Sequence, residues 1–478
     1  MQVHTYTLSK LSGETVELTE KDIVQLGSCL RGELISPKSP SYHELRAIWN
    51  GMINRFPGLI VRCAGVADVK HAVDFARKHD LLISVRGGGH NIAGSCLTDG
   101  GLMIDLSQMR GVRVDPVTKT ARVEPGCTLA DFDHEAQAFE LATPVGINST
   151  TGIAGLTLGG GFGWLSRKYG MTVDNLLSAD VVTADGNLLT VSQDSHADLF
   201  WALRGGGGNF GIITSFKFQL HQVGPQVLSG LVVYPYQHAR QVLQFYREFS
   251  ATLPDEAVVW AVMRKAPPLP FLAEEWHGKE VVILAVFYEG DVSVGKVVLD
   301  PIRAFGNSIA DVVGPHVYTS WQQAFDPLLT SGARNYWKSH NLSELSDEVL
   351  DLLITRAGNL PTPQTEIFVA QVGGQISRIG NDETAYANRD AKYIVNVHTR
   401  WDTAPEDEQN VQWTRSFFNE LAPFATGGVY VNFMAQDEET RIQAAYGLNL
   451  ERLSEIKSKY DRHNMFRSNQ NILPTAFA

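Results

Sequence analysis

The hydrophobic and polar positions of this chain change period several times, and each change marks an element that we expect. Residues 59–64 and 81–85 are short apolar runs typical of buried strands. Residues 67–79, between them, repeat apolar side chains at helical spacing and therefore predict an amphipathic helix. A strand, a helix and a second strand in this order predict a βαβ unit, which a glycine-rich turn follows directly.

The same patterns predict the elements of the remaining chain. In the first half we expect strands at residues 101–105, 120–124 and 179–186, and helices at residues 130–138 and 198–204. The first 50 residues or so are predicted to be largely helical, with one helix through Glu44–Trp49. From about residue 220 to 430, strands such as 281–288 alternate with amphipathic helices, and proline clusters such as 267–270 mark loops.

The turn at Val85–Gly94, with the sequence VRGGGHNIAG, carries the strongest chemical signal. Three adjacent glycines leave the backbone open to close approach, and consecutive amides in such a turn can converge on a phosphate. The spacing differs from the G-x-G-x-x-G fingerprint of dinucleotide-binding folds. The turn predicts an anion-binding loop that ends in His90, and a glycine-rich surface turn with an incidental histidine stays an alternative.

Three further segments follow along the chain: GIAGLTLGGGFGW at residues 152–164, RGGGGNFG at residues 204–211, and YDRHNMFRSNQNI at residues 460–472. Together with the first turn, and in this order, they resemble the berberine bridge enzyme-like flavoproteins of the vanillyl-alcohol oxidase and para-cresol methylhydroxylase superfamily. The resemblance covers nearly the whole chain, from about Asn54 to Pro474. Four ordered motifs are far more specific than a single glycine loop.

The resemblance implies an α+β fold, with a two-part FAD-binding domain of the vanillyl-alcohol oxidase type and a substrate domain that has an antiparallel sheet flanked by helices. The first part of the FAD-binding domain is expected at residues 1–220 and the substrate-binding domain at residues 221–430. Residues 431–478 would form a C-terminal segment that returns to the FAD-binding domain. The flavin would lie where the two domains meet, which is a common position for a ligand pocket.

The resemblance further implies that FAD is bound covalently to His90, through the 8α carbon of the flavin. A neutral imidazole nitrogen is a competent nucleophile for such a bond. A histidine that only hydrogen-bonds the flavin is the alternative. The residues expected to contact FAD are Arg86, Gly87, Gly88, Gly89, His90, Asn91, Ser95, Thr150, Thr151, Gly152, Gly155, Gly159, Gly160, Gly211, Ile213, Asn469 and Asn471.

Many relatives carry a second covalent bond, from a cysteine in a Gly-x-Cys-Pro-x-Val-Gly segment. The matching segment here is Gly146–Gly152, in which Asn148 stands where that cysteine would be. The resemblance therefore implies a single covalent bond, through His90.

The C-terminal motif departs from the pattern of the family. Many relatives have Tyr-x-Asn-Tyr, in which the second tyrosine accepts a proton from the substrate. Here the segment is Tyr430–Phe433, and the phenylalanine side chain cannot accept a proton. Tyr430 and Asn432 remain candidate catalytic residues, although strand alternation would place both on the face opposite Phe433.

A second candidate strand, at residues 393–398, offers another base. Asn396 and His398 share one face of that strand by alternation, and this strand is expected to belong to the sheet over the flavin. His398 is predicted to act as a general base near neutral pH, with a structurally bonded histidine as the alternative. Tyr318 and the segment Tyr336–Lys338 supply aromatic candidates for the pocket wall, although aromatic side chains are more often core residues.

Composition and charge narrow the range of partners. The chain has 478 residues, and its net charge of −12 disfavours nucleic acid and anionic membranes as partners. It contains no apolar run of the length that a transmembrane helix needs. Cys29, Cys63, Cys96 and Cys127 lack metal-type spacing, so we expect free thiols and no metal site. Because residues 1–6 do not resemble the start of a signal peptide, we expect a cytoplasmic protein.

The leading hypothesis is an FAD-dependent oxidase that moves a hydride from a C–H bond of a small organic substrate to the flavin. Molecular oxygen would then accept the electrons and give hydrogen peroxide. The reacting carbon would bear either a hydroxyl or an amine, and Phe433 favours the amine because a neutral amine can lose hydride without a base that removes an O–H proton. A dehydrogenase with another acceptor and a flavin-carrying binding or sensor protein without turnover are the alternatives. The sequence predicts no oligomeric state.

Overall fold

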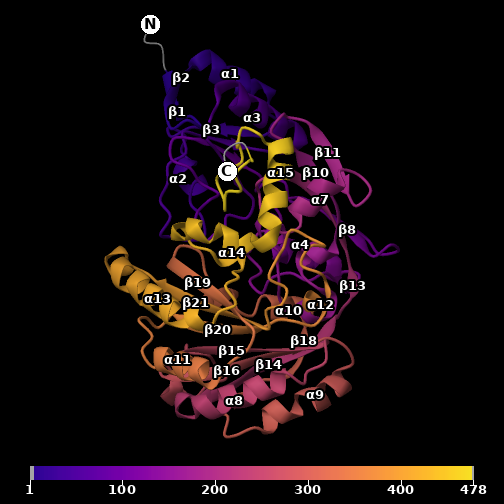
Figure 1. Ribbon diagram of the computed structural model, residues 1–478, viewed down its shortest axis with the longest axis vertical. Helices are drawn as coiled ribbons and strands as arrows, with labels where there is room; N and C mark the ends of the chain where they lie inside the picture. The colour runs from indigo at the N-terminus through magenta and orange to yellow at the C-terminus, as the bar shows by residue number, and fades with distance from the viewer. Residues whose placement is uncertain (1–4, 476–478) are drawn as a thin grey trace.

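The chain forms two halves that face each other in the computed structural model, which describes residues 5–475 apart from the side chain of Glu439 (Figure 1). The first part of the chain and the C-terminal segment build one half, and the eight-stranded sheet of the middle segment builds the other. The fold is α+β, as predicted.

The predicted βαβ unit forms the core of a four-stranded sheet. In spatial order its strands are β3 (Glu33–Ile35), β4 (Leu59–Arg62), β6 (Leu102–Asp105) and β5 (Ile83–Arg86). Strands β4, β6 and β5 are parallel, and helix α3 (Val66–His79) connects β4 to β5 and packs on the sheet through Val69, Ala72 and Val73. The glycine turn therefore begins at the carboxyl end of β5, the edge at which open α/β sheets bind their ligands.

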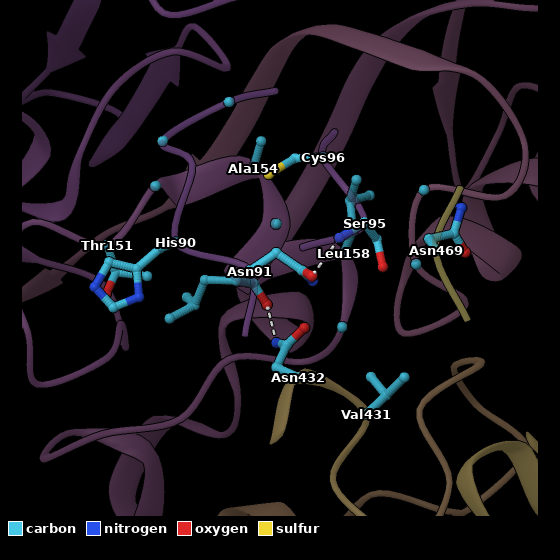
Figure 2. A pocket seen from close by; sticks show the side chains of 18 of the residues that line it. His90, Asn91, Ser95, Cys96, Thr151, Ala154, Leu158, Val431, Asn432 and Asn469 are labelled. Carbon is cyan, nitrogen blue, oxygen red and sulfur yellow. Dashed lines mark hydrogen bonds between the residues drawn. The ribbon is translucent and has the colours of Figure 1, made fainter. Parts of the chain in front are cut away.

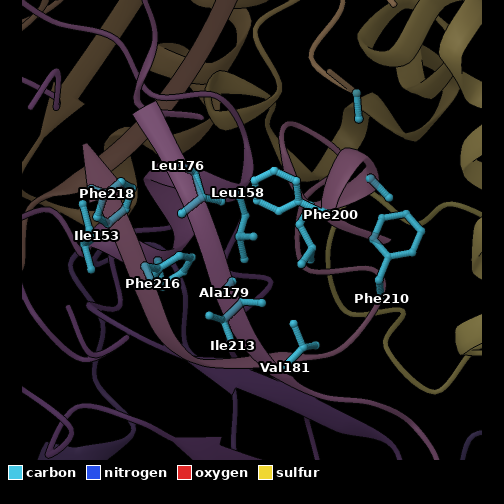
Figure 3. Close-up of a cluster of buried hydrophobic side chains, with 14 of the residues drawn as sticks. Ile153, Leu158, Leu176, Ala179, Val181, Phe200, Phe210, Ile213, Phe216 and Phe218 are labelled. Atoms are coloured by element: carbon cyan, nitrogen blue, oxygen red, sulfur yellow. The ribbon is translucent and has the colours of Figure 1, made fainter. Parts of the chain in front are cut away.

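A second, antiparallel sheet is built from residues 112–219, the part of the chain that also contains the second and third glycine segments. In spatial order its strands are β11 (Leu188–Ser192), β10 (Leu176–Val182), β12 (Ile212–Gln219), β8 (Thr120–Val123) and β7 (Val112–Asp115). Buried side chains of β10 and β12 pack against helices α5 (Ile153–Leu158) and α7 (Ala197–Leu203), as Figure 3 shows. Glycine clusters flank both helices, so this packing fixes where those clusters lie.

The large antiparallel sheet of the middle segment is covered by helices on one face. In spatial order its strands are β17 (Ala310–Asp311), β14 (Gln226–Pro235), β16 (Glu280–Tyr288), β15 (Ala257–Lys265), β20 (Glu366–Gln371), β21 (Tyr393–Trp401) and β19 (Arg334–Leu342), and β18 (Gly314–Val317) also pairs with β14. The covering helices are α8 (Ala239–Ser250), α9 (Val292–Ala304), α11 (Asp347–Ala357) and α13 (Asp407–Leu421) (Figure 1). Alternate residues such as Val259 and Val397 point to these helices, whereas Trp260 and His398 point to the other face.

The C-terminal segment returns to the first half of the molecule. Helix α15 (Leu450–Tyr460) runs beside α7, and Phe466 enters the core of the four-stranded sheet (Figure 1). The fully buried Lys457 ammonium donates to the Asp461 carboxylate and to the carbonyl oxygens of Asn209 and Phe466. This ion pair therefore holds the C-terminal segment against the third glycine cluster.

Replacing Lys457 with alanine is expected to lower the free energy of unfolding by about 3–5 kcal/mol, because it leaves the Asp461 carboxylate buried without its cation. The midpoint of thermal unfolding measures the effect. Lys459→Ala is the matched control, since the Lys459 side chain is 61% exposed and its surface pair with Asp198 contributes about 0–1 kcal/mol. Equal losses for the two variants would contradict the prediction.

The remaining elements are short. They are β1 (Thr5–Ser9), β2 (Thr15–Thr19), α1 (Glu20–Cys29), α2 (Tyr42–Leu45), α4 (Leu129–Gln137), β9 (Leu141–Ala142), α6 (Ser166–Tyr169), β13 (His221–Gln222), α10 (Tyr318–Gln322), α12 (Gln375–Arg378) and α14 (Ile442–Tyr446). Between residues 5 and 475, no helix is both long and apolar enough to cross a membrane.

The prediction of a largely helical N-terminal region is wrong in part. Strands β1 and β2 pair as an antiparallel hairpin, and residues 1–4 lie outside the described chain. Leu8 and Leu18 are buried between more exposed neighbours, an alternation that indicates strands. The helix predicted through Glu44–Trp49 ends at Leu45. Trp49 does not extend it, because the Trp49 amide donates to the carbonyl oxygen of Gly89.

Candidate active site

A cavity of about 330 Å³ lies between the two halves of the molecule. One end is lined by the glycine turn after β5, by the other two glycine segments and by Phe466 and residues 468–470. The other end is lined by the face of the large sheet that the helices leave open. Figure 2 shows His90 and Asn469 on opposite sides of the cavity, with Val431 and Asn432 along one edge.

The glycine end of the cavity offers backbone donors. Within residues 5–475, the amides of Gly87, Gly88, Gly89 and His90 donate to no protein acceptor. A Cβ added to Gly88 would lie 2.5 Å from the Cα of Gly152, so these two glycine segments can meet only because neither residue carries a side chain. Consecutive free amides in such a turn form a concave donor site that suits a phosphate.

The His90 side chain lies in the cavity wall as a neutral ring. Its imidazole stacks on Trp49, with ring centroids 4.2 Å apart and 24° between the ring planes. Asn148 Nδ2 lies 3.5 Å from His90 Nε2. Burial lowers the pKa of His90 to about 3, and the nearby charge of Arg400 also lowers it. An unprotonated imidazole nitrogen in this position can act as a nucleophile.

Aromatic side chains dominate the other end of the cavity. They are Phe162, Trp260, Trp337, Phe368, Tyr430 and Phe433. Edge-to-face pairs fix their arrangement, with ring centroids 5.0 Å apart for Trp260 and Phe368 and 4.8 Å apart for Tyr430 and Phe433. The polar side chains that the large sheet contributes to this end are Glu366, Asn396 and His398.

Glu366 and His398 are direct neighbours across strands β20 and β21. His398 Nδ1 lies 3.1 Å from Glu366 Oε1, and His398 Nε2 lies 3.4 Å from Asn335 Oδ1. Burial alone would raise the pKa of Glu366, but Arg264, which donates to it at 2.8 Å, and His398 hold that pKa at about 2. Burial lowers the pKa of His398 more than Glu366 raises it, so the ring is neutral at pH 7. A neutral imidazole oriented by a carboxylate can serve as a general base.

Residues 430–433 form a turn instead of the predicted strand. A 3-10 turn covers Val431–Phe433, so Tyr430, Asn432 and Phe433 all line the cavity and do not alternate between two faces. The Tyr430 hydroxyl accepts hydrogen bonds from the Gly161 amide at 3.1 Å and from Asn432 Nδ2 at 3.0 Å. Burial raises the pKa of Tyr430 to about 12. Tyr430 therefore keeps its proton and fixes the second glycine segment.

Comparisons with known proteins agree with this architecture. Residues 57–192 match the FAD binding domain family, and residues 429–473 match the family described as berberine and berberine like. An FAD-linked oxidoreductase of Dictyostelium discoideum is 32% identical over 429 residues, which cover 89% of this chain and 91% of the relative. The chain belongs to the berberine bridge enzyme-like FAD-linked oxidoreductases.

Two further relatives carry names that point to different substrates. The structure of 6-hydroxy-D-nicotine oxidase from Arthrobacter nicotinovorans matches with a TM-score of 0.83 and 26% identity, over 93% of this chain and 98% of the other. A xylooligosaccharide oxidase of Thermothelomyces thermophilus is 28% identical over 89% of this chain and 89% of its own. The fold is thus that of the vanillyl-alcohol oxidase and para-cresol methylhydroxylase superfamily.

The glycine end of this berberine bridge enzyme-like cavity fits FAD. The free amides after β5 suit a pyrophosphate, and a Cβ added to Gly155 would meet nothing within 4 Å, so open space lies beside that backbone. Asn469 Oδ1 is buried in the cavity wall without a hydrogen-bond partner among residues 5–475. The predicted FAD contacts that line the cavity are Gly87, Gly88, Gly89, His90, Asn91, Ser95, Thr151, Gly152, Gly155, Gly159, Gly211, Ile213 and Asn469.

Four other predicted FAD contacts do not line the cavity. They are Arg86, Thr150, Gly160 and Asn471. Arg86 donates to the carbonyl oxygen of Leu45 and so supports the turn from outside. Thr150 donates to Asn148 Oδ1 at 2.7 Å and orients a residue that does line the cavity. Gly160 has a φ of 120°, which only glycine adopts readily, so it shapes the second glycine segment.

Sequence reasoning missed part of the substrate end of this cavity. Of the aromatic candidates, Trp337 lines the cavity, whereas Tyr318 and Tyr336 do not. Trp260, Glu366 and Phe368 line it without having been predicted. The one available signal was the alternation of β20, which places Glu366 and Phe368 on one face, but only the strand register brings Glu366 to His398.

Proposed function

We propose that this protein is an oxidase that removes hydride from the carbon next to an amine nitrogen of a small, largely apolar substrate. In this proposal FAD is attached once, through His90, and molecular oxygen accepts the electrons and gives hydrogen peroxide. The observation that carries the proposal is the cavity, because one continuous space joins an end with free backbone amides to an aromatic end that contains a neutral histidine.

The aromatic end favours an amine over a carbohydrate as the substrate. Phe433 offers no hydroxyl that could form a hydrogen bond with a substrate alcohol. A bound sugar would bring many hydroxyl groups to walls that are mainly aromatic, and a buried hydroxyl without a hydrogen-bond partner is costly. The similarity to 6-hydroxy-D-nicotine oxidase agrees with this preference.

The charges around the aromatic end favour the neutral form of the amine. Glu366 carries the negative charge at this end, and Arg264 already pairs with it. Arg400 adds a positive charge and has no carboxylate within 4.0 Å in the described part of the chain. An ammonium group would therefore lose its hydration without a free counter-charge. We therefore expect kcat/KM to rise with pH until most of the unbound substrate is in its unprotonated form.

The side chains of the cavity divide the remaining work. FAD, when bound, supplies the acceptor for the hydride and its two electrons. His398 accepts the proton that the substrate nitrogen loses, on Nε2, while Nδ1 donates to Glu366 and holds the ring in place. Asn335 Oδ1 can then accept a hydrogen bond from the protonated ring. The aromatic walls orient the substrate and exclude water.

One purified preparation tests this proposal in two steps. The visible spectrum is recorded before and after acid precipitation, and flavin that stays in the pellet supports attachment through His90. Oxygen uptake is then measured with benzylic and cyclic amines and with xylose oligosaccharides. Uptake with amines alone is the expected result. Uptake with sugars alone would overturn the substrate class, and bleaching of the flavin without oxygen uptake would identify a dehydrogenase. A flavin that no candidate reduces would favour the sensor alternative.

Replacing Glu366 with glutamine is expected to shift the acidic limb of the kcat profile to lower pH. The reaction needs neutral His398, whose pKa lies below 6.5, so kcat of the unmodified enzyme should fall only as pH drops below that value. Glu366 raises the pKa of His398, so its neutralisation lowers that pKa further. Glu275→Gln, on an exposed turn, is the control. A shift of the limb toward higher pH would contradict the assignment.

A further inference from the structure

The imidazole of His90 packs against Trp49, and Trp49 in turn packs against Arg400. The His90 and Trp49 ring centroids are 4.2 Å apart, and Arg400 Cζ lies over the Trp49 ring at 5.4 Å from its centroid. Trp49 belongs to the segment between α2 and β4, whereas Arg400 belongs to strand β21 of the large sheet. These three side chains therefore connect the cofactor half of the molecule to the substrate half.

Trp49 is held in one position from both halves. Its amide donates to the carbonyl oxygen of Gly89, the residue before His90, at 3.0 Å. Its indole N–H donates to the carbonyl oxygen of Leu329 at 2.8 Å, and its carbonyl oxygen accepts from the Gly332 amide at 3.0 Å. The indole is 5% exposed. It therefore offers a fixed surface against which only one plane of the His90 ring can stack.

Arg400 is a buried cation whose direct hydrogen-bond partners are neutral. It is 2% exposed, and its guanidinium donates to the Thr330 carbonyl oxygen at 2.6 Å and to Gln364 Oε1 at 3.0 Å. No carboxylate lies within 4.0 Å of it in the described part of the chain. Asp402 and Glu366 act on this charge only from a greater distance, and contact with an indole face offsets part of the cost of burying it without a direct ion pair. The contact with Trp49 therefore helps to stabilise the buried Arg400 charge.

We propose that Trp49 and Arg400 are positioning residues for covalent attachment of the flavin, holding the His90 ring in the plane and in the dry surroundings from which it bonds to the cofactor. This inference rests on the proposed function, because it assumes attachment through His90. Neither residue lines the cavity, so both act through His90 and not by contact with the substrate.

The attachment reaction balances with molecular oxygen as its oxidant. One bond forms between a ring nitrogen of His90 and the 8α carbon of FAD. One hydrogen leaves the 8α methyl group, one leaves the imidazole, and two electrons leave with them. Oxygen, which the proposed oxidase already uses, takes both hydrogens and both electrons and becomes hydrogen peroxide. The nucleophile in this step is the neutral imidazole, so protonation of His90 stops it.

The surroundings of His90 set the pH dependence of attachment. The charged or titratable groups that act on the ring are Arg400 and His398, both on β21, and both lower its pKa. Trp49 and Asn148, the other side chains against the ring, are uncharged. Removal of the indole would admit water and return the pKa of His90 toward 6.5. Attachment would then slow at acidic pH only in the variant.

The test uses apoprotein that is produced in a host starved of riboflavin. This apoprotein is mixed with FAD, and the formation of the covalent bond is followed with time. Flavin that precipitates with the protein in acid is measured against time between pH 5 and pH 8. The unmodified protein should attach FAD at a rate independent of pH over this range, because the pKa of His90 is about 3. Trp49→Ala should slow attachment about tenfold or more, most strongly at pH 5.

Three further variants separate positioning from general loss of structure. Trp49→Phe keeps an aromatic face and should restore the rate and the flat pH profile. Arg400→Gln should slow FAD attachment at pH 5 less than Trp49→Ala does. Trp276→Ala, on a short 3-10 turn of the substrate half, should attach FAD like the unmodified protein.

The outcomes distinguish this inference from the proposed function. If flavin leaves the unmodified protein in acid, attachment through His90 fails, and this inference fails with that part of the proposed function, while oxygen uptake with amines still tests the oxidase activity. If the unmodified protein retains flavin and Trp49→Ala attaches it at the same rate, only the present inference is overturned. Slow attachment that is independent of pH and that Trp49→Phe does not restore would also overturn it, since that result indicates loss of structure.

Discussion

Replacing His398 with asparagine is expected to lower kcat by about 10²–10⁴-fold, the usual contribution of a positioned general base. The ring is neutral because burial lowers its pKa, and Glu366 orients it from the neighbouring strand. Asparagine preserves a polar side chain of similar reach but cannot accept a proton at neutral pH. Anaerobic mixing with substrate, followed through the bleaching of the flavin absorbance, measures the step directly.

The same substitution at a second buried histidine controls for its structural cost. His340 lies on strand β19 of the same sheet, stacks on Phe418 and hydrogen-bonds the Phe418 carbonyl oxygen, away from the cavity. His340→Asn should leave the rate of flavin reduction within about twofold of the unmodified enzyme, as expected for a residue without contact to the reacting groups. Comparable losses in the two variants would remove His398 from the reaction, and the base would then have to be sought elsewhere in the cavity.

Replacing His90 with alanine is expected to move the flavin entirely from the acid pellet to the supernatant. FAD should still bind reversibly, because the amides of Gly87–Gly89 and the C-terminal residues of the cavity remain. We predict a single covalent bond because Asn148 stands where a second attachment residue would lie, so we expect no other bond to retain the cofactor. Absorbance of the two fractions after precipitation, together with the mass of the intact protein, measures the change.

His463→Ala, at an exposed position near the C-terminus, is the control for this experiment. It should keep its flavin in the pellet. If His90→Ala also keeps flavin in the pellet, another nucleophile forms the bond. Cys96 is then the residue to examine, because it lines the cavity, although burial raises its pKa to about 11 and makes it a poor nucleophile at neutral pH.

The sequence predicted the glycine end of the cavity well, because its signals are local. Three adjacent glycines and a histidine after an apolar run already describe the turn after β5, and glycine leaves the chain few alternatives there. The C-terminal motif was predicted less well. Residues 430–433 satisfy strand alternation as a pattern, but the Tyr430 hydroxyl accepts from Gly161, and this long-range contact accompanies a turn.

The substrate end depends on pairing between distant strands, which periodicity cannot supply. Glu366 meets His398 only because β20 and β21 align in one register, and a shift by one residue would turn Glu366 to the helix-covered face. The N-terminal hairpin shows the same limit, since Leu8 meets its buried surroundings through pairing with β2. Residue types predicted the chemistry of the turn, whereas strand register decided which side chains share the cavity.

The return of the C-terminal segment has a consequence for the order in which the protein is made. Phe466, Ser468, Asn469 and Gln470 line the cofactor end of the cavity, and Lys457 fixes their approach. The ribosome must therefore synthesise the chain at least as far as Gln470 before the last wall of the cavity can form. All strands of the three larger sheets precede these residues in the chain, but a nascent chain that stops short of them offers the cofactor a cavity that is open on one side. We therefore expect FAD to bind only after synthesis has passed Gln470, and chains that stop before this residue should carry no flavin.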